Sequence, residues 1–356
     1  MTYRFLVCEL KTGRVLDSAP FTIEGELSRV LQGHGSGTLS LPVLHPECPP
    51  NWDQLILPWR NLILVLDGED RIVWHGVPND DAADSVDTVS FPCVTLEAYF
   101  LRRYVPSLAY VQRDQADIAR DLASICGDAA GIPLNYDCPK TGVLRDRVYA
   151  DDENARVYNR LQELAAVENG FNWTVDVDWT DDSHTRVKYT FRTGYPHLGY
   201  RTDAPEHVFD MPGNVSGFDS SRPWGDGDAA THVRAIGDGD AESKLMSAPV
   251  VDTVREAAGF VRLEDRRQFS GVKDVRTING HAQAMAAQLF GGQNVLTVTV
   301  RDGVGTSLGD LTLGDTARVT VDALTRKLDE VLVVVGWSLS SGSSEFKPTL
   351  ARLGVV

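Results

Sequence analysis

Long apolar runs are rare in this sequence of 356 residues. The most apolar stretches, Leu62 to Leu66 and Val331 to Trp337, fall far short of the roughly 20 residues that a helix needs to cross a bilayer. The first residues, Met1 to Arg4, also lack the basic segment, apolar core and small-residue cleavage site of a secretory signal. We therefore expect neither stable membrane insertion nor Sec export.

Basic residues are also in short supply. The chain has 34 Lys and Arg against 50 Asp and Glu, which gives a formal charge of -16. Tight binding to a phosphate backbone depends on neutralising Lys and Arg contacts, so it is disfavoured as the main task. DNA can pass such a protein without being held by it.

Cysteines and histidines are few and scattered. The cysteines are odd in number and contain no Cys-x-x-Cys pair, which favours reduced thiols and synthesis in a cytoplasm over a disulfide framework or zinc site. None of the 8 histidines lies three or four residues from another, so no metal-ligand pattern is present. We expect no metal, no cofactor and no catalytic histidine. The 5 cysteines are Cys8, Cys48, Cys93, Cys126 and Cys138.

The remaining composition is that of a globular protein, with 42% hydrophobic and 24% charged residues. The length is about 2.4 times a nominal domain, which predicts two or three folded units. Residues 1–100 alternate apolar and polar residues in short runs separated by Gly and Asp, the pattern of an antiparallel β domain, and its last strand is expected over Val86 to Phe100. The three prolines between His45 and Pro50 place a loop there, because proline has no amide donor for a sheet.

Residues 101–202 change to a mixed pattern. Ile118, Leu122 and Ile125 recur at helical spacing after a possible N-cap at Asp114, and a second helix is expected from about Asp152. The period then becomes two over 171–179 and 187–192, which predicts a hairpin packed on both helices. We interpret this region as a peripheral α+β domain.

Residues 203–356 begin with an acidic, Gly-rich segment and end in strands. Two Gly-Asp-Gly-Asp-Ala copies bracket an expected strand over 231–236. A helix is expected around 274–291, closed by Gly291 and Gly292, with an apolar face formed by Ile278, Ala282, Met285 and Leu289. The alternating runs that follow predict a second β-rich domain with a helical insertion. The fold class is therefore α+β, predominantly antiparallel β, in several domains.

Three motifs invite functional interpretations that their patterns do not favour. Asp176 and Asp178 lie on one face of the predicted hairpin together with Asn172 and Thr174. Lys188 and Arg192 lie opposite, which favours a solvated face over a glycosidase acid pair. The Gly-Asp-Gly-Asp copies lack the ligand order of a calcium loop and are interpreted as acidic turns. The glycines over 33–37 match neither a nucleophile elbow nor a phosphate loop, so a flexible hairpin turn is expected there.

Three tryptophans lie in loop-like sequence bordered by Pro or Gly. Trp52, Trp59 and Trp224 either anchor partners or cover a rim of the core, and the sequence does not decide between these roles. No catalytic site emerges, so an enzyme is not expected.

The order of the predicted elements carries a resemblance to a known family. Together with the stretches 29–42, 61–76, 281–300 and 313–319, it resembles the minor tail proteins of actinobacterial siphophages. Specifically, the chain looks like the tail-tip hub, which is related to the baseplate hub of contractile tails. The resemblance extends over nearly the whole chain and rests on pattern and order.

This resemblance implies a structural virion protein, made in the host cytoplasm, that forms a homotrimer. Two β-barrel-like domains per chain, at 1–100 and from 203 onward, would form a ring that matches the tail tube. The implied partners are the distal tail protein, the tail tube, the tape measure protein and a central fibre or spike. The alternatives are a tail-associated cell-wall hydrolase and a receptor-binding tail protein.

The acidic charge fits a ring through which DNA is ejected. Acidic walls repel DNA and do not retain it, and at a Debye length of about 8 Å only carboxylates near the channel act on it. We therefore expect acidic residues of the ring domains to face the axis. The candidate acidic loop or lumen residues are Asp226, Asp228, Asp238 and Asp240.

Overall fold

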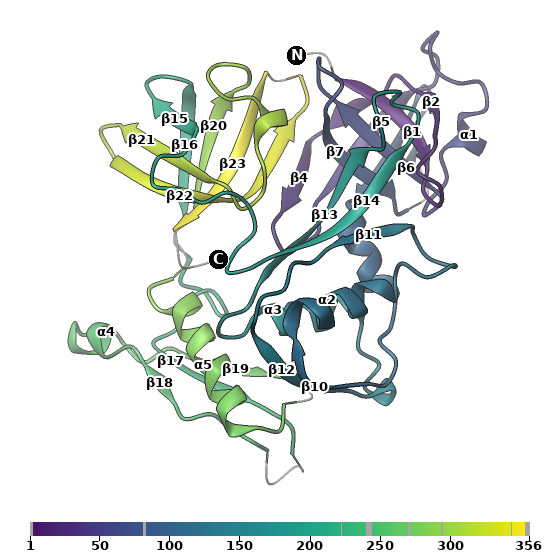
Figure 1. Cartoon of the computed structure of the whole chain (residues 1–356). Coiled ribbons are helices and arrows are strands. Elements are labelled where there is room, and N and C mark those ends of the chain that lie inside the picture. Colours follow the sequence, from purple (N-terminus) through teal and green to yellow (C-terminus); the bar gives the residue numbers. More distant parts are fainter. Residues whose placement is uncertain are drawn as a thin grey trace.

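The computed structural model describes residues 3–80, 83–221, 223–239, 244–269, 272–292, 295–342 and 344–352. Mainly antiparallel strands form two large sheets in the upper part of Figure 1, with helices and smaller sheets below them. This arrangement confirms the predicted α+β class with predominantly antiparallel strands. None of the helices in the described ranges combines the length and apolar character needed to cross a membrane.

The first large sheet is built from the N-terminal segment in the strand order β2-β1-β6-β7-β9-β5-β3, with β8 beside β9. All of its pairings are antiparallel. Its central strand β6 is buried along its whole length, because Ile63 and Val65 enter one core while Leu62 and Leu64 enter another. The strands are β1 (Arg4–Glu9), β2 (Val15–Ser18), β3 (Thr22–Glu24), β5 (Ser36–Pro42), β6 (Asn61–Leu66), β7 (Ile72–Pro78), β8 (Ala83–Asp84) and β9 (Thr88–Val94), and the short helix α1 (Trp52–Leu55) precedes β6.

The second large sheet has the order β15-β21-β22-β23-β20-β16 and takes one further strand, β4, from the N-terminal segment. Strand β4 pairs antiparallel with β22, and the two sheets share one apolar core that includes Leu27, Phe91 and Trp337. The two sheets therefore pack as one block. The strands are β4 (Glu26–Val30), β15 (His207–Met211), β16 (Val215–Ser221), β20 (Val295–Arg301), β21 (Thr316–Asp322), β22 (Lys327–Ser340) and β23 (Glu345–Arg352), with a 3-10 turn η3 (Leu308–Asp310) between β20 and β21.

A peripheral module lies against the first sheet and contains the predicted helices and hairpin. Asp114 caps the first helix by accepting a hydrogen bond from the Ala116 amide, as predicted, and the second helix begins at Val157. The hairpin strands share a second core with both helices. The elements are η1 (Leu96–Arg102), β10 (Leu108–Asp114), α2 (Gln115–Ser124), β11 (Leu134–Asp137), β12 (Leu144–Tyr149), η2 (Asp151–Glu153), α3 (Val157–Ala165), β13 (Asn172–Trp179) and β14 (Val187–Gly194).

A fourth unit, which we call the α5 lobe, projects from the lower left of Figure 1. It has its own small core, in which Ile278, Met285 and Leu289 of α5 pack on Val233 and Ala235 of β17. The periodic apolar residues of this helix are those predicted from the sequence. The lobe contains β17 (His232–Ile236), β18 (Val250–Val251), α4 (Thr253–Ala257), β19 (Glu264–Gln268) and α5 (Val275–Leu289).

Two local predictions are wrong. The glycine-rich turn over 33–37 does not close a hairpin, because β4 pairs with β22 whereas β5 pairs with β3 and β9. The turn instead carries the chain from one sheet to the other. The strand predicted to reach Phe100 ends at Val94 and continues as the 3-10 helix η1.

Candidate functional site

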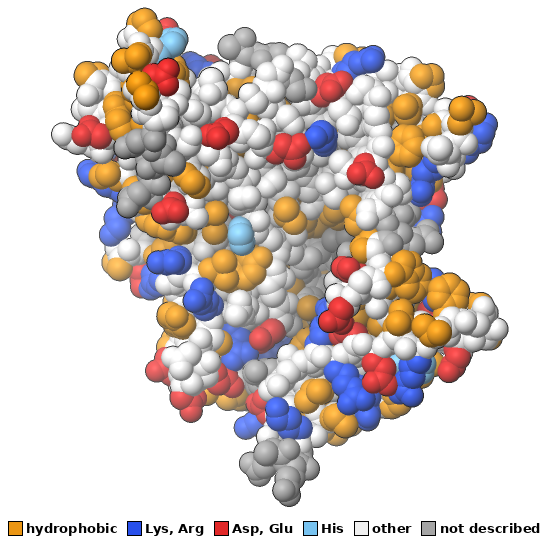
Figure 2. All heavy atoms as spheres, turned by 180° about the vertical axis from the view of Figure 1, so that it is seen from behind, with side chains coloured by type: hydrophobic (Ala, Val, Ile, Leu, Met, Phe, Trp, Pro, Cys, Tyr) orange, Lys and Arg blue, Asp and Glu red, His pale blue; other side chains and the backbone are white. Residues whose placement is uncertain are grey.

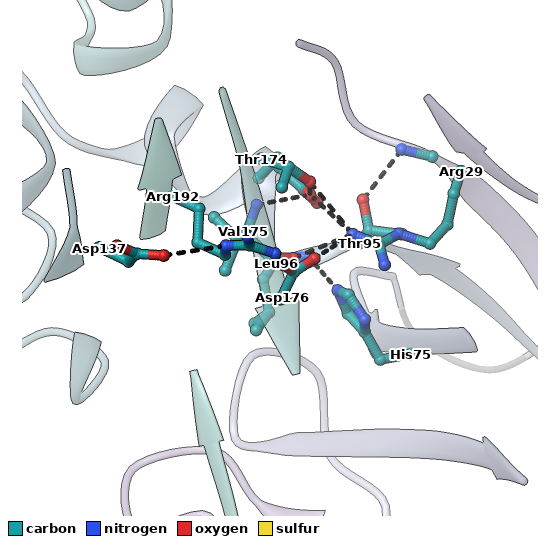
Figure 3. Close-up of polar contacts among 11 residues, drawn as sticks. Arg29, His75, Thr95, Leu96, Asp137, Thr174, Val175, Asp176 and Arg192 are labelled. Atoms are coloured by element: carbon teal, nitrogen blue, oxygen red, sulfur yellow. Dashed lines mark hydrogen bonds and ion pairs between the residues drawn. The ribbon is translucent and has the colours of Figure 1, made fainter. Parts of the chain in front are cut away.

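A buried polar cluster connects the large sheets to the peripheral module (Figure 3). We call it the buried joint and define it by side chains from four elements. These are Arg29 on β4, Glu97 on η1, Thr174 and Asp176 on β13, and Arg192 on β14.

Arg29 is the centre of the joint. Its Nη2 donates to the Val175 carbonyl at 3.0 Å and to Thr174 Oγ1 at 3.2 Å, and it lies 3.5 Å from Glu97 Oε1. Glu97 is 2% exposed and also accepts a hydrogen bond from the Val175 amide at 3.1 Å. A buried charge is tolerated when it is paired and hydrogen-bonded, so each of these two residues depends on the other.

The outer part of the joint is a chain of ion pairs across the hairpin. Arg192 donates to Asp176 at 2.9 Å and to Asp137 on β11 at 3.2 Å, so the predicted cross-strand partner of Asp176 is confirmed. The prediction of a solvated face is wrong for Asn172 and Thr174, which are 4% and 2% exposed. They are buried because this face packs against the β4 segment, where Asn172 donates to Gln32 at 3.0 Å.

His75 and Thr95 extend the joint to β7. His75 is buried and its Nε2 accepts a hydrogen bond from the Leu96 amide at 3.4 Å, while Thr95 Oγ1 accepts one from the Gly35 amide at 2.9 Å. Burial, together with the nearby Arg29, holds the pKa of His75 well below its usual range. His75 is therefore neutral at physiological pH and serves as a fixed acceptor.

The joint is built for rigidity. Its carboxylates pair with Arg29 and Arg192, and the side chain of Glu97 is buried, although its Oε2 has no hydrogen-bond partner among the described residues. A general acid or base needs access to a substrate, which this arrangement does not provide. Among the described residues, no three His, Cys, Asp or Glu side chains are grouped to hold a metal ion. The joint therefore fixes the peripheral module on the large sheets.

Trp52 and Trp59 are both half-buried and cover the edges of cores. The Trp52 ring meets Phe91 edge-on with centroids 6.3 Å apart, and the Trp59 ring lies 5.9 Å from Tyr99. The guanidinium of Arg102 lies 5.9 Å from the Trp59 ring centre. Both tryptophan rings therefore pack within their own chain, and a role for them as interface anchors stays a prediction.

Trp224 differs from the other two because it is 36% exposed on the α5 lobe, where it stacks on Phe260, which is 47% exposed, with ring centroids 5.5 Å apart. Asp226 and Asp228 follow it on an exposed turn. Asp238 is half-buried after β17, and Asp240 lies outside the described residues. Trp224 thus lies close in sequence to two of the predicted acidic residues. Whether these carboxylates face an axial channel depends on the assembly of several chains and stays a prediction.

His281 is the one strongly shifted group on the contact between α5 and the peripheral module. Its ring stacks on Phe269 with centroids 3.9 Å apart, it is 1% exposed, and neither ring nitrogen has a hydrogen-bond partner among the described residues. Burial, with a smaller contribution from the positive charge of Arg147, lowers the pKa of His281 to about 3. A neutral imidazole without partners is an energetic cost at this contact.

We expect His281→Met to raise the free energy of unfolding and to weaken its dependence on pH. The pKa of His281 in the folded state is below the usual 6.5, so the unfolded chain binds one more proton between these values. Stability is therefore lost as the pH falls through this window, by about 2 kcal/mol between pH 7 and pH 5. Urea titrations at both pH values measure this loss, with exposed His34→Met as the control. Equal pH dependence in the His281 variant and the unaltered chain would contradict the assignment.

Sequence patterns did not identify the buried joint, because Arg29 and Glu97 are far apart in the chain. The one sequence feature that could have indicated the joint is a single acidic residue, Glu97, inside the apolar run Leu96 to Phe100. A carboxylate at such a position needs a buried partner. The identity of that partner depends on the fold.

Comparison with known proteins finds the same fold in phage tail proteins. The structure of the tail protein from Neisseria meningitidis MC58 matches with a TM-score of 0.60 at 13% identity, covering 100% of this chain and 98% of that one. The 43 kDa tail protein of prophage MuSo2 from Shewanella oneidensis matches with a TM-score of 0.61 at 14% identity, covering 98% of both chains. A chain of the Francisella PdpA-VgrG complex matches with a TM-score of 0.53 at 10% identity, covering 99% of this chain and 58% of that one. No family model and no curated protein sequence matches.

Proposed function

We propose that this protein is a structural component of a bacteriophage tail tip, the hub that joins the tail tube to a central fibre or spike. The observation that carries the proposal is the shared fold with tail proteins over 98% or more of each partner's length. The rigid attachment of the peripheral module through Arg29 and Glu97 supports it, since a hub transmits force between neighbouring proteins without internal motion. The match to a chain of the PdpA-VgrG complex favours a partner of the spike class.

We further propose that three copies close into a ring. The domains assigned at 1–100 and 203–356 would each contribute one large sheet, and 101–202 would lie at the periphery. Three chains together carry a formal charge of about -48, which opposes retention of DNA in an axial channel. We expect the carboxylates along this axis to come from the two large sheets.

The oligomeric state tests the proposal directly. Light scattering on the purified full-length chain is expected to give about 117 kDa, three times the chain mass of 39.0 kDa. Immunogold labelling is expected to mark the tip of the tail in intact particles. A single copy in the particle, or labelling of the capsid, would overturn the hub assignment.

Activity assays address the two alternatives. Soluble sugar or peptide released from purified host wall by this chain alone would favour a hydrolase. Adsorption of the isolated chain to host cells would favour a receptor-binding protein. The hub proposal expects neither result, because a hub works by contact with other tail proteins and the carboxylate of Glu97 in the buried joint is only 2% exposed.

A further inference from the structure

The α5 lobe carries an exposed apolar surface, which we call the knob and define by Trp224, Val254, Phe260 and Val261. These side chains are 36%, 78%, 47% and 73% exposed. Figure 2 shows hydrophobic side chains gathered on the part of the molecule that projects at the lower right, where α4 lies when seen from behind. Contiguous apolar surface of this kind on an otherwise well-packed protein marks an interaction site.

The knob also carries negative charge. Asp226 and Asp228 are exposed beside Trp224, and neither forms an ion pair within the described residues. Arg255 and Arg262, next to the apolar side chains, already pair with Asp252 and Glu264. Arg267 pairs with Asp265 and donates to the Gly227 carbonyl, between the two aspartates, at 3.3 Å. The knob therefore combines aromatic rings with two unpaired carboxylates.

A groove of about 830 Å³ lies between the β10-β12 ribbon and the first turn of α5. Three apolar side chains on the ribbon, Val111, Leu144 and Val148, are 81%, 51% and 52% exposed. Lys273 and Arg276 line the groove from α5, are exposed, and form no ion pair within the described ranges. This surface is apolar, like the knob, but carries positive charge where the knob carries negative charge.

Three carboxylates also line the groove, Asp146, Glu168 and Asp274. Hydrogen bonds from Thr277, together with the charge of Arg276, lower the pKa of Asp274. Asp146 accepts hydrogen bonds from Gln112, and Asp274 caps α5 by accepting from the Thr277 amide at 2.8 Å. Both are thus held in place by the protein's own donors. Lys273 and Arg276 remain available to an acidic partner.

Knob and groove lie at opposite ends of α5. The groove involves its first residues, from Lys273 to Gly280, whereas the knob is next to its last turn, where Ala230 pairs with Phe290. A helix of 15 residues is about 22 Å long, so the two surfaces of one chain do not meet. A head-to-tail contact requires two different, complementary surfaces on one chain. Such contacts form a ring when the rotation from each copy to the next closes on itself.

We infer that the knob of one copy docks into the groove of the next copy, with Trp224 and Phe260 against the ribbon and Asp226 and Asp228 near Lys273 and Arg276. This inference rests on the proposed homotrimer and names the residues that join its peripheral parts. Aromatic side chains supply most of the energy of such contacts, and charge complementarity sets the orientation.

Site-specific photocrosslinking tests the contact in the full-length chain. Benzoylphenylalanine replaces Phe260, and chains labelled with ¹⁴N and ¹⁵N are mixed, so that mass spectrometry distinguishes crosslinks between copies. We expect peptides containing 144–148 or 272–276 of the other copy. The same probe at Val304, which is 51% exposed on the large sheets, is the control and is expected to miss the groove.

Charge reversal gives a second readout of the same contact. Asp226→Lys with Asp228→Lys is expected to lower the crosslink yield about tenfold, as is Lys273→Asp with Arg276→Asp, and the combination of all four restores it. Light scattering separates the two proposals. A trimer whose crosslinks lie elsewhere, or join the knob to another tail protein, overturns only this inference, whereas a monomer in the particle overturns the hub as well.

Discussion

Replacing Glu97 with leucine is expected to lower the free energy of unfolding by about 3 kcal/mol. The substitution removes the acceptor for the Val175 amide and leaves the guanidinium of Arg29 without its most buried partner. Asp176 Oδ1, at 3.6 Å from Arg29 Nη2, retains part of the pairing, so the expected cost lies at the lower end of the range for broken buried ion pairs. Urea denaturation followed by tryptophan fluorescence measures the change.

Two further variants separate the charge from the shape of Glu97. Glu97→Gln keeps an oxygen acceptor for the Val175 amide, so we expect it to cost about 1 kcal/mol, less than the leucine variant. Asp329→Asn breaks an ion pair with Arg318 on the exposed surface of the second sheet and is expected to cause no measurable change. If Glu97→Leu is as harmless as Asp329→Asn, the joint does not hold the module in place.

The same joint shows which parts of this fold were predictable. Alternation with period two identified the hairpin, and the pairing of Asp176 with Arg192 followed from it, because both residues lie close together in the sequence. Helical spacing and the Asp114 cap identified α2 for the same reason. Each of these features is fixed by interactions within about 30 residues.

Long-range pairing was not predictable in this way. The pattern of β4 is that of any half-buried strand, and nothing in it indicates that its partner is β22, some 300 residues later. Asn172 and Thr174 are polar and alternate like solvent-exposed residues, yet they are buried because Gln32 and Arg29 satisfy their hydrogen bonds. An alternating polar residue in a strand is therefore solvent-exposed only when the fold places no hydrogen-bonding partner against it.

Gly35→Ala is expected to lower the free energy of unfolding by about 3 kcal/mol or more. A Cβ at this position would lie 1.8 Å from the Ser28 carbonyl oxygen and 2.6 Å from its carbon, both part of the β4 backbone. Relief requires β4 to move by more than about 1 Å, because carbon and oxygen atoms pack at roughly 3.5 Å. That movement strains the bond from Trp74 Nε1 to the same carbonyl, 2.9 Å long, and the position of the adjacent Arg29.

Gly68→Ala is the matched control, since a Cβ there meets nothing within 4 Å and the backbone does not require glycine. It is expected to leave the stability unchanged or to raise it by about 0.5 kcal/mol, by restricting the unfolded chain. Urea titrations of both variants test the difference. Strand β4 belongs to the second sheet, and its own residue Arg29 holds the peripheral module. Destabilisation at Gly35 should therefore also weaken the resistance of that module to proteolysis. If alanine is tolerated at both positions, β4 can shift without cost. A strand that shifts in this way cannot hold the two large sheets and the peripheral module in one orientation.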